Sequence, residues 1–267
     1  MSNDFLFDDA APAKPEPLII PRREVSEVPG LSEALLKMRA QEKRRRYLGA
    51  SSLGEQCERR VAYAYRLGQT DFPPRVIALL RLGHLIETEV ETLLRAAGWN
   101  IVTELEDGRQ LSYETHGGQH RGHCDGVVLS APNINGPCVL EVKSMNRSRY
   151  AEAMKKGISV SHPLYYDQCQ MYMHHLSWNG VSLRENPAVL IAYNKDDSQI
   201  VMHRIAYDPQ RVAFLLARVE RVLATENPED IARVAREPSD FRCRVCPFAA
   251  RCWKNDVLIY SVSDEWS

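Results

Sequence analysis

Apolar residues recur at helical spacing in several stretches of the chain. Between residues 76 and 97 they occupy positions 79, 82, 86, 90, 93 and 97, and Gly98 follows as a typical helix stop. Apolar side chains at this spacing form one face of a helix that packs against another layer of structure. We expect further helices at 31–47, 146–156, 162–177 and 208–224.

Between the helices, the chain carries runs of strand-forming residues separated by turn signals. The first two expected strands flank the turn at 106–109, and the next two flank the turn at 132–136. The order helix, strands, helix, strands, helix predicts a mixed α/β domain. The expected strands are 99–104, 109–115, 120–130, 137–144, 187–194 and 199–207.

The composition narrows the class of protein. The chain has 267 residues, is 44% apolar and 26% charged, and has a formal net charge of −1. These values exclude a mostly disordered chain, and no apolar run reaches the ~18 residues of a membrane span. The sequence begins without the layout of a signal peptide, so we expect a cytoplasmic protein with no membrane partner. Any DNA-binding surface would have to be a local basic patch.

The chain divides by composition into four segments. Residues 1–30 are rich in proline and acidic groups, which predicts a disordered tail. Residues 31–75 predict a helical N-terminal segment, 76–225 the α/β core, and 226–267 a C-terminal segment with three cysteines. The basic run Lys43 to Arg46 is either a solvated helix end or a phosphate contact.

Two acidic residues and a lysine occupy related positions on the strand pair 120–130 and 137–144. Alternate side chains of a strand share a face, so Glu141 and Lys143 point to the same side. A hairpin folded about the turn places Asp125 opposite Glu141, roughly 5 Å apart at Cα. Opposed carboxylates repel, and a divalent cation between them removes that cost. Oxygen ligands of this kind suit Mg²⁺ or Mn²⁺.

Taken separately, these features are ordinary. Asp-Gly is common turn chemistry at the end of a strand, and Glu-x-Lys on a strand is often a surface ion pair. Their shared register is what favours a functional site. An ammonium beside a bound metal orients water and stabilises charge that develops on a phosphate.

The pattern Gly122-x-x-Asp125 followed by Glu141-x-Lys143 resembles the PD-(D/E)XK nuclease superfamily. The resemblance implies a restriction-endonuclease-like mixed sheet flanked by helices. It also implies that Asp125 and Glu141 are metal ligands and that Lys143 is catalytic. The chain departs from the family name in one respect, because a cysteine stands before Asp125 where the name has proline.

Two further motifs resemble the RecB-like branch of that superfamily. Residues 83–87, Gly-His-Leu-Ile-Glu, lie on the preceding helix, where that branch carries an additional metal ligand. His84 and Glu87 are three residues apart and can lean toward one site, so the choice between them stays open. On the following helix, Gln168 and Tyr172 resemble the Gln-x-x-x-Tyr motif, which implies that Gln168 orients Lys143 or the phosphate.

Three of the seven cysteines lie close together near the C-terminus, as Cys243-x2-Cys246-x5-Cys252. An odd count without an export signal argues against a disulfide framework. A Cys-x-x-Cys pair suits zinc or an iron–sulfur cluster, and the fourth ligand must come from elsewhere, with Cys57 as the candidate. The remaining three are expected in the core: Cys124, Cys138 and Cys169.

The sequence around Cys57 resembles the N-terminal cysteine motif of RecB-like nucleases with a four-iron cluster. These include the bacterial AddB subunit and the exonucleases of CRISPR adaptation. The resemblance implies a [4Fe-4S] cluster that staples a helical lid to the fold and takes no part in catalysis. Zinc and free thiols are the alternatives. The implied cluster ligands are Cys57, Cys243, Cys246 and Cys252.

The resemblance implies a Mg²⁺- or Mn²⁺-dependent deoxyribonuclease that acts as an exonuclease on single strands or DNA ends. The expected setting is recombination, repair or CRISPR adaptation in a bacterial or phage-infected cell. No P-loop is present, so a helicase, annealing protein or other recombination factor would be a separate partner. DNA would be held through its backbone and unpaired bases. The candidate contacts are Arg59, Arg60, Tyr63, Tyr65, Arg66, Arg147, Arg149, Lys155, Lys156 and Tyr172.

Two other functions stay open at this point. A non-catalytic DNA-binding recombination partner would keep the fold, but we would expect a broken acidic set, whereas Asp125, Glu141 and Lys143 are all present. A zinc-stabilised interaction module would depend on the cysteines alone. Digestion assays on a Glu141→Ala variant separate the first from an enzyme, and the metal content separates the second.

Overall fold

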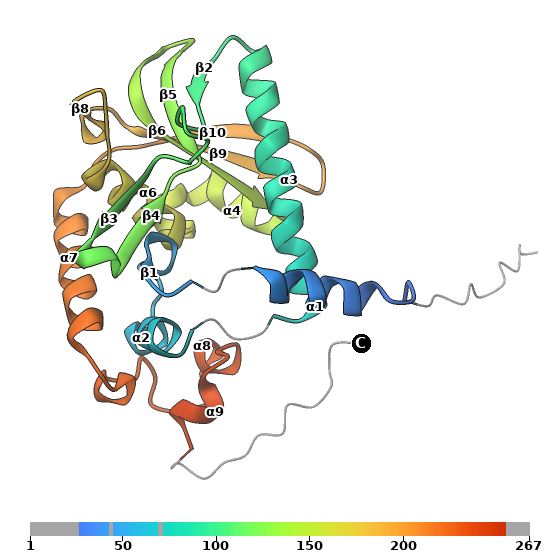
Figure 1. Ribbon diagram of the computed structural model, residues 1–267, viewed down its shortest axis with the longest axis vertical. Helices are drawn as coiled ribbons and strands as arrows, with labels where there is room; N and C mark the ends of the chain where they lie inside the picture. Colours follow the sequence, from blue (N-terminus) through green and yellow to red (C-terminus); the bar gives the residue numbers. More distant parts are fainter. Residues whose placement is uncertain (1–26, 43–44, 69–71, 255–267) are drawn as a thin grey trace, which may run out of the picture.

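A five-stranded sheet with the strand order β10-β9-β6-β5-β2 forms the centre of the computed structural model, which describes residues 27–42, 45–68 and 72–254 (Figure 1). β6 and β9 run parallel, whereas the other neighbouring pairs are antiparallel, so the sheet is mixed. The predicted mixed α/β fold is confirmed. The strands are β2 (Asn100–Val102), β5 (Gly126–Ala131), β6 (Ile134–Met145), β9 (Ala188–Asn194) and β10 (Ile200–Ile205).

Helices cover both faces of this sheet, because alternate residues of the central strands are apolar on each side. On one face, Leu140 and Val142 of β6 pack against Ile86 and Val90 of α3 (Pro74–Ala96). On the other face lie three helices at the positions expected from the sequence, with slightly different ends, and a short fourth helix, which was not expected. The expected helices are α4 (Arg147–Lys156), α6 (Pro163–His175) and α7 (Pro209–Ala224), and the fourth is α5 (Ile158–Ser161).

The expected strand 120–130 is in fact two strands that belong to different sheets. β4 (His120–His123) lies between β1 (Leu48–Gly49) and β3 (Ser112–Thr115) in a three-stranded sheet, and the chain returns to the central sheet at β5. Gly122 permits this packing, since a Cβ there would lie 2.4 Å from the Tyr113 ring and 2.8 Å from the Tyr172 ring. The sequence signal for one continuous strand was therefore wrong at the point where the chain changes sheets.

The strands on either side of the turn at 106–109 do not pair with each other. β2 pairs with β5, and β3 pairs with β4. The two strands are drawn apart because Ile101 of β2 is buried under α3, whereas Tyr113 of β3 is buried with α6 residues in the other core cluster. Tertiary packing thus overrides the local hairpin signal.

Segments from the N-terminal and C-terminal parts of the chain lie side by side, away from the central sheet (Figure 1). They are α2 (Glu58–Leu67) near the start and α8 (Phe241–Arg244) and α9 (Ala249–Cys252) near the end. α1 (Leu31–Gln41) packs across α3 and ends earlier than the expected 31–47. Lys43, Arg44 and residues 1–26 of the expected tail lie outside the described residues.

Short elements complete the fold. They are η1 (Ala50–Ser52), η2 (His116–Gly118), η3 (Leu183–Glu185), η4 (Pro228–Asp230) and the hairpin of β7 (Ser177–Trp178) and β8 (Val181–Ser182). Within the described part of the chain, no helix has the length and apolar character needed to cross a membrane.

Candidate functional site

Asp125 lies where the chain passes from one sheet to the other, immediately before β5 begins at Gly126. Gly126 pairs with Leu140 of β6, so the predicted register of the hairpin is confirmed and Asp125 falls beside Glu141. Oδ2 of Asp125 accepts a hydrogen bond of 2.8 Å from the backbone N–H of Val142. This bond fixes the Asp125 carboxylate against β6 at the predicted position.

Glu141 is fully buried, with 0% of its side chain exposed, and its Oε1 forms an ion pair with Nζ of Lys143. Among the described residues, Lys143 is the only partner of this carboxylate, and neither oxygen of Glu141 has another hydrogen-bond donor. Burial and the charge of Asp125, opposed by Lys143, together raise the pKa of Glu141 to about 8. A buried carboxylate with so few donors is costly unless it has a cationic partner.

Lys143 is the cation of this group. Burial opposes its charge, but the carboxylates of Glu141 and Asp125 outweigh that effect and raise the pKa of Lys143. Burial likewise raises the pKa of Asp125, with Lys143 acting in the opposite direction. Lys143 therefore stays an ammonium at neutral pH, and its side chain keeps 18% of its surface exposed for contact with a ligand.

A cleft between α3 and the hairpin brings a third acidic side chain toward this pair. Asp125, His84 and Glu87 line it, together with Glu91 and Glu104. Nδ1 of His84 lies 3.1 Å from Oε2 of Glu87. The charge of Glu87 acts on both Asp125 and Glu141, whereas that of His84 is felt at Asp125. The α3 motif thus faces the carboxylates from across the cleft, as expected for a shared site.

The chemistry of this donor set suits a hard divalent cation. Asp125, Glu141 and Glu87 bring three carboxylates within electrostatic reach of one another, against the single ammonium of Lys143. The incompletely paired oxygens of Glu141 are the kind of ligand that Mg²⁺ or Mn²⁺ prefers. Among residues 27–42, 45–68 and 72–254, no three His, Cys, Asp or Glu side chains already form a site for a metal ion. The residues fit the cation by charge and donor type.

α6 places the Gln-x-x-x-Tyr motif under the same strand. Gln168 is nearly buried, and its Nε2 donates a 2.7 Å hydrogen bond to the hydroxyl of Tyr172. Tyr172 is 2% exposed and packs against Gly122 and Tyr113, so a DNA strand cannot reach it. The expectation that Tyr172 contacts DNA is wrong, and its hydroxyl accepts a hydrogen bond from Gln168 inside the protein instead.

Tyr165, one turn before Gln168 on α6, was missed by the sequence reasoning. Its ring lies 5.6 Å from Nζ of Lys143 and 5.5 Å from the guanidinium of Arg149, and it stacks on His162. Cation–π contact of this kind favours a fixed position for both cations. The signal available was its spacing of three residues from Gln168, which places both on one helix face.

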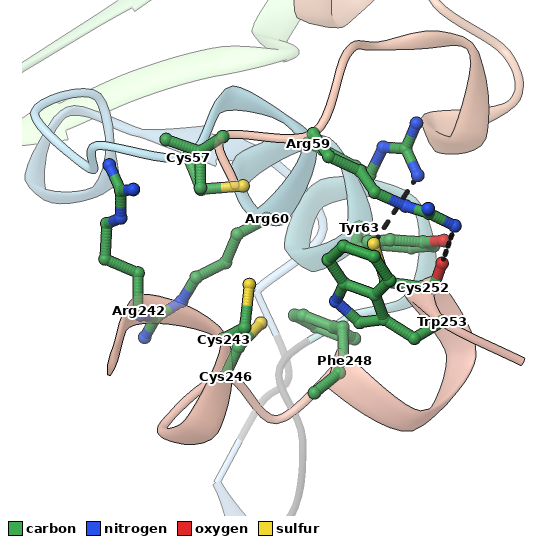
Figure 2. Close-up of a pocket in the computed structure, with 13 residues that line it drawn as sticks. Cys57, Arg59, Arg60, Tyr63, Arg242, Cys243, Cys246, Phe248, Cys252 and Trp253 are labelled. Carbon is green, nitrogen blue, oxygen red and sulfur yellow. Dashed lines mark hydrogen bonds between the residues drawn. The ribbon is translucent and has the colours of Figure 1, made fainter. Parts of the chain in front are cut away.

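The four cysteines that the sequence groups together line one cavity beside α2, along with Arg59, Arg60 and Trp253 (Figure 2). Cys57 precedes α2, and the other three come from the segment around α8 and α9. The remaining cysteines are buried in the core, as expected: Cys124, Cys138 and Cys169.

The cavity disfavours free thiolates and offers buried N–H donors. Burial raises the pKa of Cys243, against an opposing contribution from the Trp253 indole, and burial also raises the pKa of Cys246. Nε1 of Trp253 is buried without a hydrogen-bond acceptor of good geometry, although the indole lies close to Cys243. Within the described ranges, no three of these sulfurs are gathered for a single metal ion. The four thiols that line the cavity match an iron–sulfur cluster in donor type and number.

Two other expected DNA contacts are also buried. Arg59 is 9% exposed, and its guanidinium donates hydrogen bonds to backbone carbonyls of the protein. Tyr63 is 1% exposed and stacks on Phe248, with 5.3 Å between the ring centroids. A DNA strand cannot reach either residue. Arg60 is partly exposed beside Glu55, and Arg147 at the start of α4 keeps 72% of its side chain exposed.

Comparisons with known proteins add distant structural likenesses. No family model matches the chain, and no curated protein matches it. The crystal structure of SSO0001 superposes with a TM-score of 0.47 at 18% identity, covering 83% of this chain and 94% of that one. The alkaline exonuclease LHK-Exo of Laribacter hongkongensis superposes with a TM-score of 0.45 at 20% identity, covering 72% and 91%. Its complex with dAMP gives 0.44 at 18% identity, covering 73% and 90%.

Proposed function

We propose that the chain is a metal-dependent DNA nuclease that hydrolyses phosphodiester bonds. The observation that carries this proposal is the fully buried Glu141 carboxylate, which has Lys143 as its only partner in the described part of the chain and the like charge of Asp125 beside it. A purely structural ion pair would gain little from incompletely paired oxygens and a neighbouring like charge. A cation-dependent site explains why all three groups are held together.

Asp125 and Glu141 would hold Mg²⁺ or Mn²⁺, with Glu87 as the favoured third ligand because its charge acts on both carboxylates, and with His84 paired to Glu87. When bound, the ion supplies a Lewis acid that polarises the scissile phosphate and lowers the pKa of a coordinated water. The backbone N–H of Val142 holds Asp125 in place for this purpose.

Lys143 supplies a positive charge at the carboxylate site. Because its pKa is raised, it keeps its proton and donates hydrogen bonds to the attacking water or to a phosphate oxygen rather than serving as a general base. The Tyr165 ring below it limits its rotamers. Gln168, held by the Tyr172 hydroxyl, lies on the helix under the same strand and would orient Lys143 or the phosphate.

DNA would be bound mainly through its phosphates, by the exposed cations of α4, which follows directly from the catalytic strand β6. Arg147, Lys155 and Lys156 lie on that helix. Arg149 faces Tyr165 and so connects this basic helix to Lys143. We propose action on single strands or DNA ends, within recombination, repair or CRISPR adaptation, with any unwinding left to a separate helicase.

We also propose that the cysteine cavity holds a [4Fe-4S] cluster with a structural role. What supports this proposal is that Cys57 and the three C-terminal cysteines line one cavity, so four thiols are available as ligands. When bound, the cluster contributes binding free energy that joins the segment around α8 and α9 to α2.

Digestion of end-labelled single-stranded, duplex and circular DNA in Mg²⁺ or Mn²⁺ tests the nuclease proposal. We expect the wild-type protein to digest the linear substrates and Glu141→Ala to lose about 100-fold or more of that activity. The matched control is Glu220→Gln, an exposed acid on α7 that pairs with His116. Equal digestion by wild-type protein and Glu141→Ala would reject the proposal.

A further inference from the structure

Two arginines on α2 hold the C-terminal part of the chain in the same way. Nε and Nη2 of Arg59 donate to the carbonyls of Ile231 and Glu229, at 2.5 and 2.7 Å. Two helical turns later, Nε and Nη2 of Arg66 donate to the carbonyls of Thr225 and Leu223, at 2.9 and 2.7 Å. Both guanidiniums therefore act as clamps between α2 and the segment that descends from α7.

Arg59 differs from Arg66 in one contact and in its burial. Its third donor, Nη1, points into the cysteine cavity and donates to Sγ of Cys252 at 3.4 Å (Figure 2). Arg59 is buried, whereas Arg66 is on the exposed side of α2, with its guanidinium over Tyr65, and does not line the cavity. The backbone clamp is common to both residues, and the N–H···S bond belongs to Arg59 alone.

The sulfur that Arg59 contacts lies at the far end of the C-terminal segment, 193 residues from Arg59 in sequence. The backbone carbonyl of the same cysteine accepts a hydrogen bond from Arg233 at 2.7 Å. Cys252 is thus held at both its backbone and its side chain, and Arg59 connects it to α2, the helix that begins directly after Cys57.

Arginines surround the thiols of the cavity. Arg60 and Arg242 line it but are paired with Glu55 and Asp240. Arg59 instead donates to two backbone carbonyls and to the sulfur of Cys252, so its charge acts on the thiols directly. A cluster with four thiolate ligands has a net negative charge that increases when it accepts an electron. N–H···S bonds and nearby positive charge stabilise the more negative, reduced form, and so raise the reduction potential.

We propose that Arg59 is the positioning residue of the sulfur centre, fixing Cys252 as a ligand and raising the reduction potential of the cluster through its N–H···S bond. The inference rests on the proposed iron–sulfur centre and specifies its regulation, because the potential decides whether the cluster stays oxidised or accepts an electron in the cell. Reduction adds one electron to the cluster and neither forms nor breaks a covalent bond.

The test compares wild-type protein with Arg59→Met, Arg59→Lys and Arg66→Met, each purified anaerobically as the full chain. Iron and acid-labile sulfide are measured first, and a titration with dithionite followed by absorption and electron paramagnetic resonance then gives the midpoint potential. We expect a more negative potential for Arg59→Met, an intermediate one for Arg59→Lys, which keeps a charge and a donor, and the wild-type value for Arg66→Met.

Two results would overturn the inference while leaving the centre itself intact. Iron-loaded Arg59 variants with the wild-type potential would remove the role of the N–H···S bond. Equal shifts of the midpoint potential in Arg59→Met and Arg66→Met would mean that Arg59 acts only by holding the backbone. If Arg59→Met does not fold, the Arg59→Lys potential decides between the same outcomes. A colourless wild-type protein without iron would instead contradict the proposed iron–sulfur centre, and the Arg59 inference with it.

Discussion

The carboxylate site and the cysteine cavity are built in different ways. The carboxylate site stands on neighbouring strands and on helices that pack over one sheet, so its geometry follows from the fold alone. The cysteine cavity joins the start and the end of the chain, and α8 and α9 have only four residues each. Helices this short have little stability of their own. We therefore expect the first site to be preformed, and the second to depend on the cluster that we propose it binds.

The largest expected effect comes from removing a proposed cluster ligand. If the cluster joins the two ends of the chain as we propose, Cys57→Ala should lose its iron and expose the segment beyond α7 to proteolysis. Limited proteolysis and iron analysis measure both effects. The matched control is Cys138→Ala in the core, which should keep its iron at a cost of about 1 kcal/mol in unfolding free energy. Iron-loaded, protease-resistant Cys57→Ala would contradict the difference drawn between the two regions.

Gly122→Ala should be the strongest single destabilisation near the carboxylate site. A Cβ would meet the Tyr113 and Tyr172 rings at 2.4 and 2.8 Å, and both rings are buried. We expect a loss of about 3 kcal/mol in unfolding free energy, measured by urea denaturation. Gly83→Ala is the control, since a Cβ there meets nothing within 4 Å. A wild-type midpoint for Gly122→Ala would mean that the two rings are not packed as described.

The charge of Glu141 should give the metal-free protein a pH-dependent stability. Burial raises the pKa of Glu141 to about 8, above the ordinary value of 4.5, so the folded state resists ionisation. The resulting penalty is absent below pH 4.5, grows as pH rises, and is complete above pH 8. From pH 5 to 9, the stability of wild-type protein relative to Glu141→Gln should fall by about 4 kcal/mol.

Mg²⁺ should reduce the pH-dependent loss of stability, because a bound cation compensates the buried charge of Glu141. Thermal denaturation with and without Mg²⁺ should show the pH-dependent loss reduced in wild-type protein and no such response in Glu141→Gln. Parallel pH profiles for the two proteins, with or without Mg²⁺, would mean that Glu141 is not the group responsible.

The smallest expected effect is at the basic surface of α4. Arg147→Ala should weaken binding of single-stranded DNA about threefold and lower the slope of log affinity against log salt by about 1, as for one phosphate contact. Fluorescence anisotropy over a salt series measures both. Arg184→Ala, an exposed arginine of η3, is the control and should leave the slope unchanged. The same slope for Arg147→Ala and wild-type protein would remove Arg147 from the DNA surface.

The sequence predicted the parts of the site that depend on local periodicity. Glu141 and Lys143 share a face because strand side chains alternate, and the register that brings Asp125 beside them follows from the length of the hairpin. The positions of α3 and α6 could be predicted as well, because the spacing of their apolar residues marks the face that packs on the sheet.

Features that depend on distant contacts could not be predicted in this way. The change of sheet at Asp125 needs the aromatic packing around Gly122, and the burial of Arg59 needs the carbonyls of Ile231 and Glu229, which are about 170 residues away. A sequence motif shows that an arginine is present but not whether its donors face solvent. The prediction that Arg59 contacts DNA was wrong for that reason, and the same prediction for Tyr63 was wrong because its ring is buried.

Anomalous diffraction from a crystal soaked in Mn²⁺, at a concentration that supports digestion of DNA, tests the proposed metal site directly. We expect an anomalous peak at coordination distance from the carboxylate oxygens of both Asp125 and Glu141, with Nζ of Lys143 alongside. A map with no peak between these two carboxylates, or with an ion bound elsewhere in the cleft without Glu141, would contradict the proposed metal site.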